Sequence, residues 1–162
     1  INYSVNTRAS GAGAGLARKE RMAFRITNEW IIDIPEDFER RVEDGKLIFW
    51  KTGITVITVA FILPENTGKL ELLNQIQSKI PEDVLETFVS TKGQIVGLGY
   101  TRIQKREGEK NRLSLYAFTA SDTSCLQTAY YLDDPEDLAW AKTSWQSTIY
   151  QPEEGTAGEP LA

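Results

Sequence analysis

The residue types that most enzymes use for chemistry are almost absent from this chain. It contains no histidine and a single cysteine, Cys125, among 162 residues. The lack of histidine excludes serine–histidine and cysteine–histidine nucleophile pairs and removes the commonest metal ligand. Cys125 falls in a predicted strand with no basic residue nearby to lower its pKa, so we expect it to be buried and unreactive. We therefore predict neither a metal nor a cofactor.

Adjacent carboxylates are the remaining candidates for chemistry. Two acids can act as the acid and the nucleophile of a glycosidase, or they can hold a hard cation. Each pair here flanks a proline or a helix start, where acidic residues are expected for capping and solubility. We therefore predict no catalytic residue among them. The pairs are Glu36/Asp37, Glu82/Asp83, Asp133/Asp134 and Glu136/Asp137.

The last predicted helix carries a candidate binding residue, Trp140. Asp134 can cap this helix and Pro135 suits its first position. Leu138, Ala141, Trp145 and Ile149 form one apolar stripe at helical spacing. Trp140 lies nearly opposite this stripe, on the side of Ser144 and Ser147. Either it is an exposed anchor for a partner, or another part of the chain, such as residues 35–45 or the tail, covers it.

A basic hairpin is the second candidate binding feature. Arg102, Lys105 and Arg106 lead into a charged turn that also contains acidic residues. Such a hairpin can contact an acidic protein or RNA, or it can be solvated with its charges paired locally. The net charge of −5 argues against nucleic-acid binding. We predict a protein partner and no nucleic acid, with Arg102, Lys105, Arg106, Trp140, Ser144 and Ser147 as its contacts.

The elements that must position these residues are mostly strands. Alternating apolar residues separated by turn residues predict strands at 24–26, 30–34, 46–50, 54–63, 84–90, 94–104, 112–119 and 124–132. The segment 35–45 is polar and turn-rich, with Phe38 and Val42 as expected anchors. A helix is predicted around residues 72–80, and Pro81 ends it.

This order predicts an α+β fold with a central antiparallel sheet of about six to eight strands flanked by helices. Short turns between neighbouring strands require antiparallel pairing. The strand at 54–63 is apolar almost throughout, so we expect it in the middle of the sheet, covered on both faces. The expected core includes Trp30, Ile32, Ile57, Val59, Phe61, Leu73, Ile76, Leu115 and Trp145.

The pattern is that of one domain, residues 22–150. Residues 1–21 have no apolar periodicity, and we expect a flexible extension or a leader that precedes Met22. Residues 151–162 are expected to be a loose acidic tail. We find no signal peptide and no membrane segment in this sequence, which predicts a cytoplasmic protein.

The start of the predicted domain resembles a known family. The segments Phe24–Ile26 and Glu29–Pro35 are similar to the F-x-I and W-x-I-x-(I/L)-P pattern that opens PsbP-like domains. This superfamily includes a photosystem II extrinsic protein and a nuclear Ran-GTPase-binding protein. The resemblance implies an α/β/α sandwich and an accessory role without a reaction. The histidine metal ligands of the photosystem member have no counterpart here, because this chain has no histidine.

These observations predict a non-enzymatic protein-binding domain, such as a bacterial immunity or accessory protein. A small-ligand or lipid-binding module, with a cleft between sheet and helix, is the first alternative. A carboxylate-based hydrolase is the second.

Overall fold

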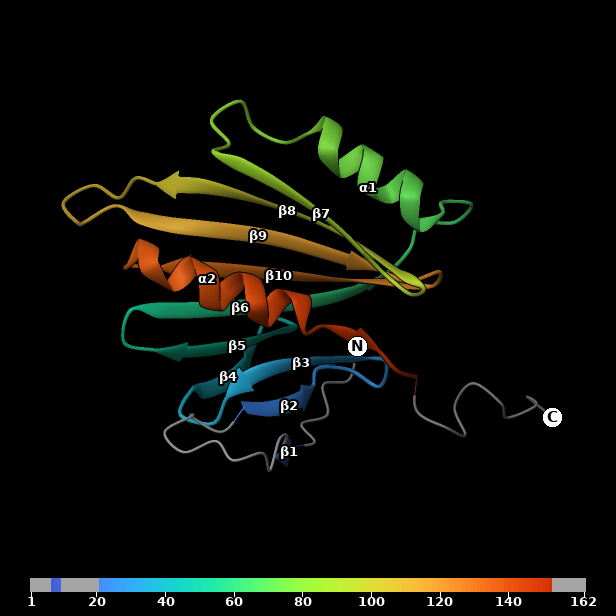
Figure 1. The fold of residues 1–162 in the computed structure, drawn as a ribbon, viewed down its shortest axis with the longest axis horizontal. Coiled ribbons are helices and arrows are strands. Elements are labelled where there is room, and N and C mark those ends of the chain that lie inside the picture. Colours follow the sequence, from blue (N-terminus) through green and yellow to red (C-terminus); the bar gives the residue numbers. More distant parts are fainter. Residues whose placement is uncertain (1–6, 10–20, 153–162) are drawn as a thin grey trace.

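A computed structural model describes residues 7–9 and 21–152. Its elements follow the predicted order, with two helices among many strands (Figure 1). In chain order they are β1 (Thr7–Ala9), β2 (Arg21–Arg25), β3 (Trp30–Pro35), β4 (Glu39–Glu43), β5 (Lys46–Lys51), β6 (Ile54–Ile62), α1 (Lys69–Ser78), β7 (Glu86–Lys92), β8 (Ile95–Gln104), β9 (Arg112–Ala120), β10 (Ser124–Leu132), the 3-10 turn η1 (Pro135–Asp137), α2 (Leu138–Gln146) and β11 (Ile149–Tyr150).

Seven of these strands form the large sheet, in the order β4-β5-β6-β10-β9-β8-β7, and every pair is antiparallel. The α+β class and the central antiparallel sheet are therefore confirmed. Tight turns join its hairpins, and Gly53 and Gly93 adopt the positive φ angles, +84° and +59°, that these turns require. The central strand is β10 rather than β6, because the chain returns after α1 to pair β10 with β6.

The first hairpin does not join the large sheet, which corrects the expectation of a single sheet. Strands β2 and β3 form a second sheet with β1 and β11, in the order β1-β2-β3-β11. The strand at Thr7–Ala9 also corrects the view that residues 1–21 form no strand. Otherwise that extension, residues 1–6 and 10–20, lies outside the described residues, as does most of the predicted tail.

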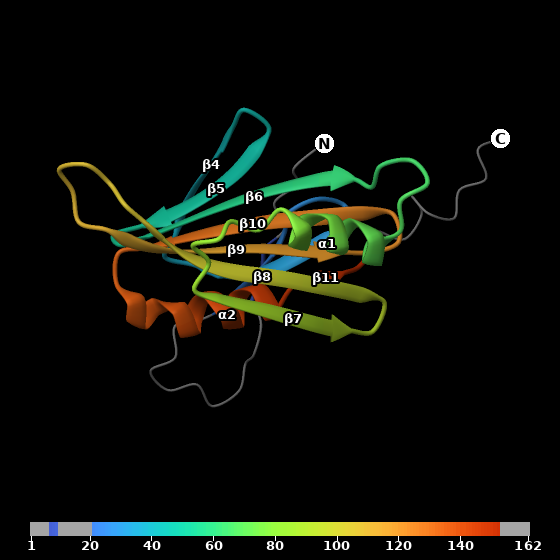
Figure 2. The same cartoon turned by 90° about the horizontal axis from the view of Figure 1, so that it is seen from above.

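The two faces of the large sheet are covered differently (Figure 2). Its inner face packs against α2 and the small sheet, which together bury Trp30, Ile32, Leu115 and Trp145 in one core cluster. Its outer face packs against α1 in a smaller cluster that contains Leu72 and Cys125. The sheet is therefore the middle of three layers, as the fold class predicts.

The predicted core is correct on the inner face and only partly so on the outer face. Trp30, Ile32, Leu115 and Trp145 are buried, and so is Leu73 of α1. The remaining four expected core residues are half-buried: three lie on the outer face of β6, which α1 covers only in part, and one lies on α1 itself. They are Ile57, Val59, Phe61 and Ile76.

Segment 35–45 shows the same mixture of correct and wrong anchors. Phe38 is buried as predicted, whereas Val42 is 59% exposed on the edge strand β4. Phe38 precedes β4, whereas Val42 lies within it; β4 is an edge strand rather than the expected turn, and all five of its residues are exposed. The final helix begins as predicted: the Asp134 side chain accepts a hydrogen bond from the Glu136 amide at 2.9 Å.

Trp145 fixes α2 against the large sheet. Its indole N–H donates to the hydroxyl of Thr119 at 3.0 Å, and the side chain is 2% exposed. The ring lies against Gly97 and Gly99 of β8; a Cβ added at Gly99 would stand 3.1 Å from two ring carbons. The two glycines therefore leave the space that the tryptophan ring fills.

We predict that Trp145→Ala lowers the free energy of unfolding by about 3–5 kcal/mol, because it opens a cavity and removes the bond to Thr119. Gly99→Ala should cost about 1–3 kcal/mol in the parent, where the methyl group meets the ring. In the Trp145→Ala background the same methyl group enters the cavity and should cost almost nothing. Urea denaturation of the four proteins tests this, and equal effects of Gly99→Ala in both backgrounds would contradict the contact.

Candidate functional site

The predicted basic hairpin lies at one end of the large sheet, and its arginines are paired within the chain (Figure 1). Arg102 makes two hydrogen bonds of 3.0 Å to the carboxylate of Asp83. This pairing holds the pKa of Asp83 below its usual value, and the charge of exposed Lys105 adds to the effect. Arg106 contacts Glu109 at 3.0 Å and Asp133 at 3.5 Å. This arrangement is the locally paired hairpin that the sequence left open.

Trp140 is half-buried rather than exposed. Its ring stacks on Phe38 with centroids 5.4 Å apart and planes 16° apart. It also meets the ring of Tyr130 edge-on at 5.9 Å. Segment 35–45 therefore covers Trp140, which is the second of the two possibilities that the sequence left open; a partner contact at this residue is not supported.

Ser144 and Ser147 serve the neighbouring strand β3. The hydroxyl of Ser144 accepts a hydrogen bond from Tyr130 and donates one to the backbone carbonyl of Asp33, each at 3.0 Å. The hydroxyl of Ser147 accepts a hydrogen bond from the backbone amide of Asp33 at 3.0 Å. Ser144 is buried, so the prediction that its side chain contacts a partner is wrong. The helix turns these serines inward because β3 has backbone groups to satisfy there.

A surface that the sequence did not predict lies on the outer face of the large sheet. In Figure 2, α1 lies over β8, β9 and β10, while β4, β5 and β6 extend beyond it. Strand registers place six half-exposed apolar and aromatic residues beside one another there, and we call them the outer-face patch. They are Ile48, Trp50, Ile57, Val59, Tyr116 and Tyr131.

Aromatic rings and arginines are combined in and around the outer-face patch. Tyr116 lies between Tyr100 and Tyr131, with ring centroids 5.3 and 6.0 Å away. The guanidinium of Arg112 lies 4.7 Å from the centre of the Tyr131 ring. At the other side, the guanidinium of Arg41 lies 5.2 Å from the ring of Trp50. Tryptophan, tyrosine and arginine are the residues that contribute most at protein interfaces.

Tyr131 and Tyr100 on this face are neutral at physiological pH. Burial, and then the neighbouring Tyr116, raise the pKa of Tyr131 to about 12. Burial also raises the pKa of Tyr100. Their hydroxyls can therefore donate and accept hydrogen bonds without carrying charge.

The alternation of β6 was the signal for this surface in the sequence. Its inner-face residues Val56, Thr58 and Ala60 are buried, whereas Ile57 and Val59 between them are half-exposed. Both sets are apolar or β-branched, so the sequence alone resembles a strand that is covered on both faces. Whether the second face of such a strand is covered depends on the number and length of the helices, which the period-two pattern does not show.

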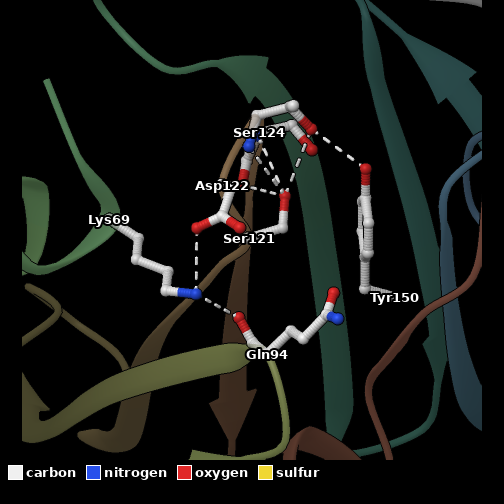
Figure 3. A network of polar contacts seen from close by, with 7 residues as sticks. Lys69, Gln94, Ser121, Asp122, Ser124 and Tyr150 are labelled. Atoms are coloured by element: carbon white, nitrogen blue, oxygen red, sulfur yellow. Dashed lines mark hydrogen bonds and ion pairs between the residues drawn. The ribbon is translucent and has the colours of Figure 1, made fainter. Parts of the chain in front are cut away.

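A polar network connects several loops at the opposite end of the sheet from the hairpin (Figure 3). Lys69 donates to the backbone carbonyl of Gln94 at 2.6 Å and contacts the carboxylate of Asp122 at 3.0 Å. Tyr150 lies 3.0 Å from the hydroxyl of Thr123 and donates to Glu29 at 2.7 Å. These contacts fasten the start of α1 and strand β11 to the loop after β9.

Beside this network lies a pocket of about 220 Å³ lined by Lys92, Gln94, Ile95, Ile149 and Tyr150. Its volume is below the roughly 300–1,000 Å³ of typical ligand sites. Burial raises the pKa of Tyr150, so its phenol is neutral at physiological pH. Two isoleucines line the pocket beside Lys92, Gln94 and Tyr150, so its wall is partly apolar.

The single thiol among the described residues is buried. Burial raises the pKa of the Cys125 thiol to about 12, which keeps it protonated and unreactive. Within residues 7–9 and 21–152, no group of three acidic or cysteine side chains is placed to hold a metal ion. In the same part of the chain, no helix is long and apolar enough to cross a membrane.

We predict that Trp140→Ala lowers the free energy of unfolding by about 2 kcal/mol, because the half-buried ring contributes packing area and two aromatic contacts. A cycle with Phe38→Ala should give a coupling of about 0.5–1.5 kcal/mol for the stacked pair. The measurement is urea denaturation of the single and double variants. Additive effects would show that the two rings do not stabilise one another.

Stability should also fall above about pH 9. Cys125 and Tyr131 ionise near pH 9 and 10 when unfolded but only near pH 12 in the folded protein. Between the unfolded and the folded pKa values, the folded state binds more protons than the unfolded state, so the free energy of unfolding falls as the pH rises. Below about pH 9 both groups are protonated in both states, and the full stability is present. Unfolding free energies from pH 7 to 11 test this. Cys125→Ala should remove the loss of stability that begins near pH 9. A free energy of unfolding that does not change with pH would contradict the burial of Cys125 and Tyr131.

Comparison with known proteins bears on the fold. No family model and no curated protein sequence matches the chain. A crystal structure of a protein from Bacteroides thetaiotaomicron VPI-5482 has a TM-score of 0.60 at 12% identity, covering 78% of this chain and 46% of that one. The chain thus spans less than half of that protein. The solution structure of cyanobacterial PsbP (CyanoP) from Synechocystis sp. PCC 6803 has a TM-score of 0.58 at 9% identity, covering 87% and 98%. The chain therefore has a PsbP-like fold, as the resemblance of residues 24–35 predicted.

Proposed function

We propose that this protein is a non-enzymatic protein-binding domain and that the outer-face patch is its contact surface. The observation that carries the proposal is the pairing of Trp50 and Tyr131 with arginines on a sheet face that α1 leaves uncovered. Large side chains with few rotatable bonds lose little entropy on binding, and an arginine already stacked on a ring loses less still. Both features favour a specific protein contact.

The patch also has the composition of an interface core. Its apolar residues lie in adjacent strands, so that they form one continuous area rather than scattered side chains. The residues that surround it carry both signs of charge, for example Arg41 and Glu43, which contact one another at 2.8 Å. An apolar centre with a polar rim is the arrangement found in protein–protein interfaces.

The alternatives have less support. The carboxylates proposed for a hydrolase are dispersed, and several form ion pairs: Asp37 with Lys51, Asp83 with Arg102 and Asp133 with Arg106. The pocket beside Tyr150 is small for a lipid or a drug-sized ligand. Within the class of protein-binding domains, we propose an immunity or accessory role in a bacterial system. Such a protein acts by covering a surface of its partner and needs no catalytic group.

The proposal predicts a stoichiometric protein complex that depends on the patch. The immobilised protein would be used to capture its partner, and the purified pair would be measured by calorimetry. Trp50→Ala and Tyr131→Ala should each weaken binding at least tenfold, or by about 1.4 kcal/mol, because each removes a central anchor. Thermal melting of each variant shows whether it remains folded.

Leu70→Ala is the matched control, because Leu70 is an exposed apolar residue on α1 outside the patch. It should bind as the parent does. Equal affinity of the parent and both patch variants would exclude this surface. Recovery of only a small molecule by native mass spectrometry, or tight binding to single-stranded RNA, would contradict the proposed class of function.

A further inference from the structure

The large sheet has two edge strands, β4 and β7, and they differ in how they are protected. An edge strand presents unpaired backbone N–H and C=O groups that can pair with another strand. Figure 2 shows β7 as the outermost strand on its side of the sheet. β4 is the corresponding strand on the other side.

The β4 edge is protected against pairing with a second copy of itself. Four of its five residues, Glu-Arg-Arg-Val-Glu, are charged. An antiparallel pair of two β4 strands centred on Arg41 would place Glu39 opposite Glu43, and Arg41 opposite Arg41. Like charges directly opposite one another are destabilising. Such a charged edge is how proteins prevent edge-to-edge association.

The β7 edge has the opposite pattern. Its sequence Glu-Thr-Phe-Val-Ser-Thr-Lys carries charges only at its two ends, and they are of opposite sign. Val89, at its centre, is 73% exposed. An antiparallel pair of two β7 strands centred on Val89 places Glu86 opposite Lys92 and Thr87 opposite Thr91. Each of these is a favourable cross-strand pair.

The faces of the two sheets also match in this arrangement. Within β7, Phe88 and Ser90 share the inner face, and Thr87, Val89 and Thr91 share the outer face, as their registers with β8 show. A twofold axis perpendicular to the sheet at Val89 keeps inner residues beside inner residues. On the inner face, Lys142 of α2 lies 4.1 Å from the centre of the Phe88 ring.

From this self-complementary pattern we propose that the protein forms a symmetric dimer by antiparallel pairing of β7 with β7 of a second copy. The two large sheets then become one continuous sheet, and the interface is the same patch on both subunits. The dimer leaves β5 and β6, with most of the outer-face patch, at the far side of the sheet from β7. It is therefore independent of the proposed partner site.

The charge pattern allows a swap experiment. Sedimentation velocity over a range of concentrations would measure the dimer dissociation constant of the parent, E86K, K92E and the double variant E86K/K92E. Each single variant puts like charges opposite one another at both ends of the strand pair and should weaken the dimer at least tenfold. The double variant restores opposite charges and should return to within about threefold of the parent. If E86K or K92E weakened the dimer by disturbing β7 rather than through charge repulsion, the double variant would stay as weak as the single variants.

Cross-linking tests the register directly. In V89C, the two introduced thiols meet at the twofold axis, and buried Cys125 does not compete for oxidation. Mild oxidation should give a covalent dimer of V89C, whereas V42C on the charged β4 edge should remain monomeric. A parent that is monomeric at every concentration, or a dimer that neither the charge swap nor V89C affects, would overturn the proposal.

Discussion

Two buried tryptophans attach the inner layer of this protein, α2 and the small sheet, to the large sheet. Trp145 of α2 donates its indole hydrogen to Thr119, and Trp30 of β3 donates to Ser124 at 2.9 Å. Both acceptors are hydroxyls of the large sheet. Each ring contributes a large apolar area, and each N–H has a partner, so that neither leaves an unsatisfied donor in the core. The helix and the small sheet are therefore attached to the same face by the same kind of contact.

This arrangement explains why the binding surface lies on the other face. The inner face is covered by α2 and by the small sheet, whereas in the described part of the chain the outer face packs against α1 and the loop that precedes it. In Figure 2, α1 runs along the strands, so it spans the sheet with its diameter of about 10–12 Å, much less than the width of seven strands about 4.8 Å apart. The rows of residues furthest from α1 stay half-exposed and include Trp50, Ile57 and Tyr131. The aromatic and arginine side chains in and around the patch are thus exposed because α1 covers so little of this face.

The sequence predicted the elements better than their assembly. Period-two patterns and turn glycines located β5, β6, β8, β9 and β10 within one or two residues, because these signals are local. They could not show that β2 and β3 leave the large sheet, since pairing partners are set by contacts distant in sequence. The candidate site was missed for a related reason. Trp140 and Trp145 have equal hydrophobicity, and helical spacing separates their directions without showing that Phe38 covers Trp140. The outer-face patch could be located only with the strand register, which the sequence does not show.

The strand edges show how a single physical problem receives different solutions in one molecule. β3 pairs with β11 only at Trp30 and Ile31, and the backbone of Asp33 beyond that point is satisfied by Ser144 and Ser147 of α2. The serines that resembled a partner surface in the sequence therefore close a strand edge. β4 is kept apart from other strands by its charges. β7 has neither a helix along its edge nor a charge at its centre, although an exposed central valine is a liability in an isolated protein. A protein that protects the β3 and β4 edges and leaves the β7 edge uncharged at its centre is better explained if the β7 edge has a partner.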